Sequence, residues 1–208
     1  MVRRSAFAVI ALAAAFASAP AAAQSNFYGV ANIGSSTIDV DPSSVNAFAI
    51  ANGTAVVSTV PDNHDLAFKL QLGYRFSNNY ALEGGYTDLG KAGFTTVTAA
   101  PSTVGGKKEA YLFNLDLVGT WPLNQTFSLL GRFGIYYWET KSILPFGAGT
   151  IGIKDTSYDF KLGAGVQYEL SKTVALRAEY ERLNGVGSAT TTGDSKINML
   201  SVGAVLKF

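Results

Sequence analysis

The feature of this sequence that most constrains its fold is a two-residue alternation of apolar and polar side chains, repeated along eight stretches. In residues 154–170 one face carries Tyr158, Phe160, Leu162, Ala164, Val166, Tyr168 and Leu170, and the other carries Ser157, Asp159, Lys161, Gly163, Gly165, Gln167 and Glu169. A period of two is typical of a β-strand with one apolar face. The pattern predicts eight strands, near residues 26–40, 65–76, 80–89, 109–121, 126–141, 154–170, 173–184 and 195–208.

The connections between these stretches alternate strictly in length. The short, polar ones are residues 77–79, 122–125 and 171–172, and the long, irregular ones are residues 41–64, 90–108, 142–153 and 185–194. Antiparallel strands that meet through short turns at one end must meet through the long loops at the other. Transmembrane barrels of bacteria have this asymmetry, with short periplasmic turns and long outer loops.

The last stretch, residues 197–208, alternates up to the terminal Phe208 with no turn after it. An apolar strand with an unpaired edge invites aggregation, whereas a closed barrel pairs its last strand with its first. We therefore expect this stretch to pair with residues 27–33 and to close the barrel.

Two environments fit the alternation: a soluble barrel with its apolar face inward, or a membrane barrel with that face toward lipid. Only 15% of the residues are charged, against about 25% in soluble proteins. Glycines lie on the polar face, as a crowded small-barrel interior requires. Aromatic residues gather near strand ends, as at membrane interfaces. These features favour an all-β, eight-stranded antiparallel up-and-down transmembrane β-barrel.

The N-terminus resembles a secretory signal. Arg3 and Arg4 precede an apolar stretch and three small residues, Ala21 to Ala23. We expect residues 1–23 to be cleaved before Gln24 and residues 24–208 to form the barrel domain. The alternative is a retained membrane anchor. Cleavage would leave 14 basic and 15 acidic residues, a balance that argues against nucleic acid as a partner.

The polar face is expected to place six charges of each sign inside the barrel: Lys69, Arg75, Arg132, Lys161, Arg177 and Lys207, and Glu83, Asp116, Asp159, Glu169, Glu179 and Glu181. An unpaired buried charge is costly, but a paired, hydrogen-bonded set is tolerable. We predict an interior charge network built from Glu83, Asp116, Arg132, Lys161, Arg177 and Glu179. Such a network would plug the barrel and would give little or no stable conductance.

Catalytic and cofactor chemistry is sparse. The one histidine, His64, lies beside Asp62 and Asp65, and a Ser-His-Asp arrangement with Ser58 remains an alternative to a solvated loop histidine. The absence of cysteine and the single histidine make a transition-metal site improbable. We expect neither an enzyme nor a cofactor.

Two outer segments, residues 45–60 and 143–153, are apolar for loops that should face water. Either the strands extend past the membrane and carry them as hairpin arms, or they bind a partner surface, a hydrophobic ligand or lipopolysaccharide acyl chains.

The segments ALEGGYTDLG (from residue 81) and LRAEYERLNGVGSATTTGDSKINMLSVGAVLKF (from residue 176) resemble the transmembrane domain of the outer membrane protein A and opacity family of outer-membrane β-barrels. The resemblance implies the cell outer membrane of a Gram-negative bacterium. The ending, with Ser201, Gly203, Leu206 and Phe208, looks like the signal that the barrel assembly machinery recognises.

The resemblance also bears on the interior. Glu83 and Arg177 match two members of the family's charge cluster, whereas Val118 and Gln167 stand where a basic and an acidic residue are expected. We therefore expect the Glu83–Arg177 ion pair to form. The charged residues with which the family's acid and base could pair instead are absent, and this argues against a gate that opens by exchanging ion-pair partners.

Together these features predict a non-enzymatic, monomeric outer-membrane barrel that contributes to envelope integrity and surface-loop interactions. Its expected partners are outer-membrane lipid and lipopolysaccharide, the barrel assembly machinery, and a host or surface ligand through the outer loops. A narrow porin or carrier for small, hydrophobic molecules is the alternative, and an outer-membrane lipid-modifying enzyme is the third hypothesis.

Overall fold

A computed structural model describes residues 26–38, 43, 50, 56–62, 64–98, 103–146, 149–186 and 195–208. In this part of the chain the strands are β1 (Phe27–Ile38), β2 (Val56–Asp62), β3 (His64–Arg75), β4 (Tyr80–Thr98), β5 (Thr103–Pro122), β6 (Phe127–Phe146), β7 (Gly149–Glu169), β8 (Val174–Val186) and β9 (Ser195–Lys207). None of the described residues forms a helix that is long and apolar enough to cross a membrane.

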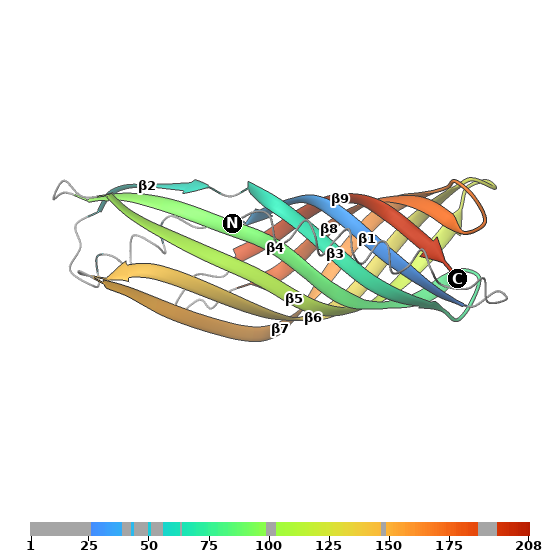
Figure 1. The fold of residues 1–208 in the computed structure, drawn as a ribbon, viewed down its shortest axis with the longest axis horizontal. Coiled ribbons are helices and arrows are strands. Elements are labelled where there is room, and N and C mark those ends of the chain that lie inside the picture. The colour runs from blue at the N-terminus through green and yellow to red at the C-terminus, as the bar shows by residue number, and fades with distance from the viewer. Residues whose placement is uncertain are drawn as a thin grey trace.

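The strands close into a barrel (Figure 1). The order around the sheet is β4-β3-β1-β9-β8-β7-β6-β5, and β5 pairs again with β4. Every neighbouring pair is antiparallel. The short strand β2 pairs with the outer end of β4, beyond the part of β4 that pairs with β3. The prediction of an eight-stranded antiparallel barrel is therefore confirmed.

The terminal strand closes the barrel as expected. On one side β9 pairs with β8, and on the other it pairs with β1, from Tyr28 opposite Lys207 to Ile38 opposite Ile197. The amide of Phe208 donates to the carbonyl oxygen of Phe27 at 3.2 Å. The chain's last residue is thus held at the seam.

The strands differ greatly in length. Strands β1, β3, β8 and β9 have 12 or 13 residues, whereas β4 to β7 have 19 to 21. A membrane-spanning strand needs about 9–11 residues. Strands β4 to β7 therefore continue roughly 30 Å along their length beyond the barrel wall. Figure 1 shows this outer extension, with β2 beside β4, at the end opposite the short turns.

The expectation of irregular loops at residues 90–108 and 142–153 was wrong. Both segments are hairpin arms, paired from Lys91 opposite Glu109 to Val97 opposite Thr103, and from Ser142 opposite Ile153 to Phe146 opposite Gly149. The first is rich in β-branched threonine and valine, which favour strands. The apolar segment 143–153 fits the hairpin-arm alternative, while residues 45–60 lie mostly outside the described residues.

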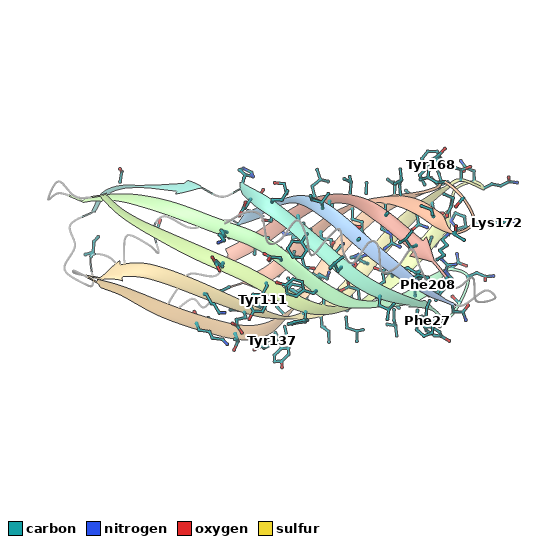
Figure 2. The ribbon with its side chains drawn as sticks, in the orientation of Figure 1. Phe27, Tyr111, Tyr137, Tyr168, Lys172 and Phe208 are labelled. Atoms are coloured by element: carbon teal, nitrogen blue, oxygen red, sulfur yellow. The ribbon has the colours of Figure 1, made fainter. Side chains whose placement is uncertain are left out.

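The apolar face points outward around the whole barrel (Figure 2). Leu72, Phe133, Leu162 and Val202, from four different strands, have exposed fractions of 53, 52, 52 and 56%. A soluble barrel would bury these side chains, because exposing apolar surface to water is unfavourable. This face is the surface that contacts lipid.

Aromatic side chains lie at both borders of the lipid-facing surface. Near the short turns, the Phe27 and Tyr74 rings are 4.9 Å apart between centroids, and the Phe127 and Tyr168 rings are 4.8 Å apart. Figure 2 shows Phe27 and Tyr168 at this end and Tyr111 and Tyr137 near the start of the outer extension. Two aromatic girdles of this kind mark the membrane interfaces of a transmembrane barrel.

The interior is layered. An apolar layer near the turns consists of Tyr28, Val30, Ala81, Ala175 and Val205. A second apolar layer near the outer extension consists of Ile38, Ala67, Leu89, Ala110, Leu112, Tyr136, Trp138, Leu183, Ile197 and Met199. The charged side chains that are at most 5% exposed come from strand positions between these two layers. The polar interior that we expected is therefore limited to the middle of the barrel. The apolar layers at the two ends of the interior were not expected.

Candidate functional site

The middle of the barrel holds a set of paired acidic and basic side chains, here called the central charge network. Among the described residues it comprises four bases and four acids, each at most 5% exposed: Lys69, Arg132, Lys161 and Arg177, with Glu83, Asp116, Glu179 and Glu181. They come from strands β3 to β8. The structure brings together all six residues that we proposed for the network and adds Lys69 and Glu181.

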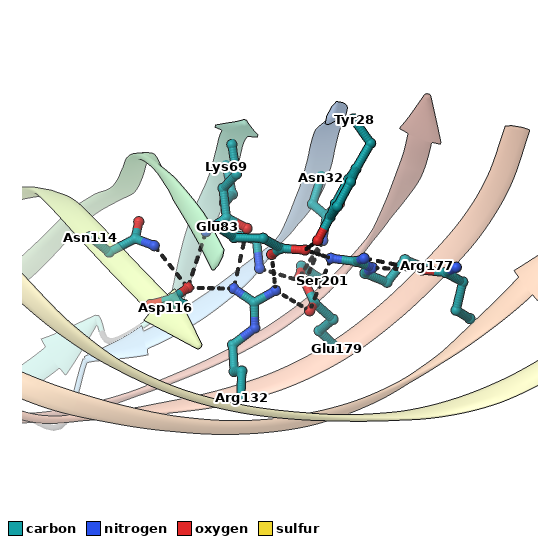
Figure 3. Close-up of polar contacts among 12 residues, drawn as sticks. Tyr28, Asn32, Lys69, Glu83, Asn114, Asp116, Arg132, Arg177, Glu179 and Ser201 are labelled. Atoms are coloured by element: carbon teal, nitrogen blue, oxygen red, sulfur yellow. Dashed lines mark hydrogen bonds and ion pairs between the residues drawn. The ribbon is translucent and has the colours of Figure 1, made fainter. Parts of the chain in front are cut away.

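Arg132 on β6 is the hub of the network (Figure 3). Its Nη2 lies 2.7 Å from Glu83 Oε2 and 2.5 Å from Glu179 Oε1. Its Nη1 lies 2.6 Å from Asp116 Oδ2. A guanidinium suits this position, because its planar donors engage several carboxylates at once.

Arg177 on β8 forms the second cationic centre. Its Nη1 lies 2.6 Å from Glu83 Oε1, and its Nε and Nη2 donate to Gln167 Oε1 at 3.2 and 3.0 Å. Gln167, at a position where the resemblance predicts an acid, therefore accepts hydrogen bonds without adding charge. Val118 is buried and apolar.

Val118 and Gln167 carry no charge, so the family's alternative partners are absent as expected, but Glu83 still has a second cationic partner. Arg132 occupies that role from β6, next to the β5 strand on which Val118 lies. Comparison of fixed sequence positions missed this pairing, because the second base lies on a neighbouring strand.

The two lysines connect the remaining acids. Lys161 Nζ lies 2.7 Å from Glu181 Oε2 and 3.0 Å from Asp116 Oδ2. Lys69 Nζ lies 2.5 Å from Glu179 Oε2 and also contacts Glu181. Lys69 on β3 and its partners on β8 come from strands that are not neighbours, so these bonds cross the lumen.

Tyr28 closes the network on the side of the turns. Its hydroxyl donates to Glu83 Oε1 at 2.7 Å, and its ring centre lies 5.7 Å from the Arg75 guanidinium and 5.9 Å from that of Arg177. A Cβ at Gly73 would lie 2.2 Å from the Tyr28 ring, so only glycine lets the ring lie flat there.

Some expected interior charges lie outside the network. Arg75 faces the Tyr28 ring, and Lys207 pairs with Glu169 at 2.5 Å near the turns. Asp159 Oδ1 accepts the amide hydrogen of Phe160 at 2.6 Å. The central layer is therefore smaller than the expected six charges of each sign, and it remains balanced.

The hydrogen bond described at His64 is to a threonine hydroxyl. The Nδ1 atom of His64 lies 3.0 Å from Thr37 Oγ1. Asp65 uses its two oxygens to accept the amide hydrogens of Leu66 and Lys91, at 2.7 and 2.6 Å. Ser58 is exposed on β2, and the side chain of Asp62 is outside the description. No group of three or more potential metal ligands occurs within the described residues.

The four residues of the predicted assembly signal lie on β9 and at its end. Ser201 is buried and its Oγ accepts from Asn32 Nδ2 at 3.3 Å. A Cβ at Gly203 would lie 2.0 Å from the Ala31 carbonyl oxygen, so the two strands approach closely there. Leu206 and Phe208 are half-buried. Their role in assembly stays a prediction.

Comparison with known proteins agrees with this architecture. Residues 7–208 match the family described as outer membrane protein beta-barrel domain. Outer membrane protein A of Salmonella typhi is 29% identical over 139 residues, which cover 65% of this chain and 38% of that protein. The chain therefore matches well under half the length of this relative.

Solved structures share the fold at low sequence identity. Neisserial surface protein A has a TM-score of 0.56 at 16% identity, with 90% of this chain and 100% of that chain covered. Ail, the attachment invasion locus protein of Yersinia pestis, solved with a heparin analogue, has a TM-score of 0.50 at 17% identity, with 88 and 99% covered. From its closed barrel, its lipid-facing surface and the match over nearly its full length, this chain belongs to the outer membrane protein β-barrel family and resides in the cell outer membrane.

Proposed function

We propose that the protein is a non-enzymatic, monomeric barrel with a sealed interior, which contributes to envelope integrity and presents its outer extension at the cell surface. The observation that carries this proposal is the central charge network. Four bases and four acids bind one another across the lumen, and the described residues place an apolar layer on each side of them.

The energetics of this arrangement support a sealed interior. A hydrated ion that crossed the barrel would have to separate pairs such as Arg132–Asp116, at 2.6 Å, and Arg177–Glu83, also at 2.6 Å. Breaking a buried pair costs about 3–5 kcal/mol. The two apolar layers add a dehydration barrier, because they offer few hydrogen bonds to a passing ion.

The surface role is supported by the length of β4 to β7, which carry paired backbone well beyond the lipid-facing wall. Ail, a barrel of similar fold, was solved in complex with sucrose octasulfate. A ligand at the outer extension of the present protein is therefore part of the proposal.

Planar-bilayer recording tests the sealed interior. The purified protein should give little or no stable conductance, in contrast to the narrow porin or carrier that is the alternative. A double substitution, Lys161→Ala with Glu181→Ala, removes a buried pair 2.7 Å apart without changing net charge. This variant should conduct more often than the wild type, because the lumen loses side-chain volume while its net charge stays the same. Large, long-lived single-channel steps from the wild type would contradict the proposal.

A further inference from the structure

A shallow, open hollow of about 410 Å³, here called the rim pocket, lies at the turn between β5 and β6. Three polar residues of the turn line it, together with one aromatic residue from β6 and one from β7: Asn124, Gln125, Thr126, Phe127 and Tyr168. Its volume is in the range of small-molecule sites, about 300–1,000 Å³. None of these five side chains carries a charge, so the pocket suits a ligand without net charge.

The rim pocket lies at the level of lipid headgroups. Phe127 and Tyr168 are register partners and belong to the aromatic girdle near the short turns. Figure 2 shows Tyr168 at that end of the barrel. Aromatic girdles lie at the membrane–water interface, and the short turns of bacterial transmembrane barrels face the periplasm. The pocket is therefore adjacent to the headgroups of the periplasmic leaflet.

The two rings of the pocket form a corner that can receive a cation. Their centroids are 4.8 Å apart and their planes are inclined by 50°. Phe127 is 46% exposed and Tyr168 is 38% exposed, so both rings remain accessible from outside the barrel. The face of an aromatic ring attracts an ammonium group through its quadrupole. Two inclined rings can therefore contact one ammonium group together.

The turn supplies hydrogen-bond donors beside this corner. Asn124 Oδ1 accepts the amide hydrogens of Thr126 and Phe127, at 2.8 and 2.7 Å. These two bonds identify the oxygen of the Asn124 side chain and leave its Nδ2 group with both hydrogens unused among the described residues. The Gln125 amide and the Thr126 hydroxyl add further donors. Such groups bind phosphate oxygens through charge-assisted hydrogen bonds.

We propose that the rim pocket binds the headgroup of a zwitterionic aminophospholipid of the periplasmic leaflet. Its ammonium group lies in the corner of Phe127 and Tyr168, and its phosphate accepts hydrogen bonds from Asn124 and Gln125. The headgroup has no net charge, which matches the uncharged lining, whereas an anionic phospholipid brings a charge that nothing in the lining neutralises. The proposal depends on the outer-membrane location of the barrel and is independent of whether its interior conducts.

The test measures the lipid selectivity of the full protein by native mass spectrometry from detergent micelles. Phosphatidylethanolamine and phosphatidylglycerol with the same acyl chains are added in equal amounts, and the wild type should bind phosphatidylethanolamine more tightly. The double variant Phe127→Leu with Tyr168→Leu keeps the surface apolar but removes both ring faces. It should lose about ten-fold in this affinity, because each exposed cation–π contact contributes roughly two- to five-fold.

The chain offers a matched control for the rings. Phe27 and Tyr74 lie in the same girdle with nearly the same geometry, 4.9 Å between centroids and 49° between planes, but do not line the rim pocket. The double variant Phe27→Leu with Tyr74→Leu should change the affinity for phosphatidylethanolamine by less than about two-fold. Heat-modifiable gel migration checks that each variant is folded.

A variant of Asn124 tests the phosphate end separately. Asn124→Asp keeps the oxygen that accepts the two amide hydrogens of the turn and replaces the Nδ2 donors with a negative charge. The affinity for phosphatidylethanolamine should fall about ten-fold, the contribution of one hydrogen bond to a charged group. Equal affinity of the wild type for the two lipids, an equally large loss in the control pair, or an unchanged affinity in Asn124→Asp would overturn the proposal.

Discussion

Arg132 holds three carboxylates, from Glu83, Asp116 and Glu179, while 5% of its surface remains accessible. Each of these acids would be unstable in the lumen alone, because a buried charge without a partner is far from the solvation that water provides. One side chain therefore determines whether charges from three other strands are compatible with the barrel interior.

Substitution of Arg132 by Met should destabilise the barrel by about 3–5 kcal/mol, because three buried acids lose a shared partner. Urea unfolding in detergent micelles, followed by the heat-dependent gel shift, measures this loss. Arg182→Met is the matched control: Arg182 is exposed on the same barrel and should change stability by less than about 0.5 kcal/mol. Adding Glu83→Gln to the Arg132 variant should restore part of the stability, and an absence of any rescue would argue against charge balance as the cause.

Two adjacent glycines make a second contrast at this scale. A Cβ at Gly85 would lie 2.1 Å from the Leu70 carbonyl oxygen, whereas a Cβ at Gly84 would meet its nearest atoms at 3.7 Å. We expect Gly85→Ala to destabilise the barrel by about 1–3 kcal/mol through overpacking. Gly84→Ala should be tolerated, because its methyl group points to the lipid side. The same urea titration distinguishes the two, and equal stabilities would contradict the close approach of β3 and β4.

At the scale of the element, β6 shows how far sequence reasoning reaches. Arg132 points inward, as the alternation predicted, and Phe133 next to it points outward, because side-chain direction follows from a period of two. Between Ile135 and Trp138, however, both faces of the strand are apolar. The two-residue period therefore no longer indicates which side chains point inward. Tyr136 and Trp138 belong to the outer apolar layer. The available signal was this continuous apolar run, which indicates a strand segment buried on both faces.

The charge partners were less predictable than the faces. Which base meets which acid depends on strand stagger and on contacts across the lumen, such as Lys69 with Glu179. Neither quantity is encoded in the local alternation. The inward residues could be named from the sequence, but Arg132 could not be identified as the hub. The outer parts of β4 and β5 were also missed, because glycine and proline near their ends favoured loops over strands. For β6 and β7, the extension past the membrane was one of the two alternatives for residues 143–153.

The outer extension makes a prediction about pH. Hydrogen bonds from Lys154 and Tyr111 lower the pKa of Glu139 to about 2, from an ordinary value of 4.5. A carboxyl group whose pKa falls on folding stabilises the folded state above its unfolded pKa, and this contribution is lost as the pH falls toward the folded pKa. The urea midpoint of the wild type should therefore exceed that of Glu139→Gln at pH 7, and the difference should shrink between about pH 4.5 and pH 2. If the difference between the two urea midpoints does not change with pH, the loss of stability comes from packing and not from the charge of Glu139.

At the scale of the whole molecule, we expect insertion to depend on the seam between β9 and β1. Phe208 contributes an aromatic ring at the turn end and an amide bonded to the Phe27 carbonyl oxygen. We predict that Phe208→Ser reduces the fraction of folded protein in outer-membrane preparations several-fold, as judged by heat-modifiable migration. Phe76→Ser removes another aromatic ring at the same rim, 52% exposed, and should have a much smaller effect. Equal losses would indicate a general need for aromatic residues at the rim and no assembly signal at the end of the chain.

The network also links the first and last strands of the barrel to β8 and, through β8, to β4 across the lumen. Asn32 on β1 donates to Glu179 on β8 at 3.0 Å and to Ser201 on β9 at 3.3 Å, and Arg177 on β8 reaches Glu83 on β4 at 2.6 Å. An open, partly inserted sheet would leave these charges facing lipid without partners. We therefore expect the barrel to close and its interior charges to pair at the same time, so partly closed barrels should be rare. Once formed, the cylinder can open only by losing several cross-lumen bonds together, so its persistence in the membrane is a matter of slow unfolding as much as of equilibrium stability.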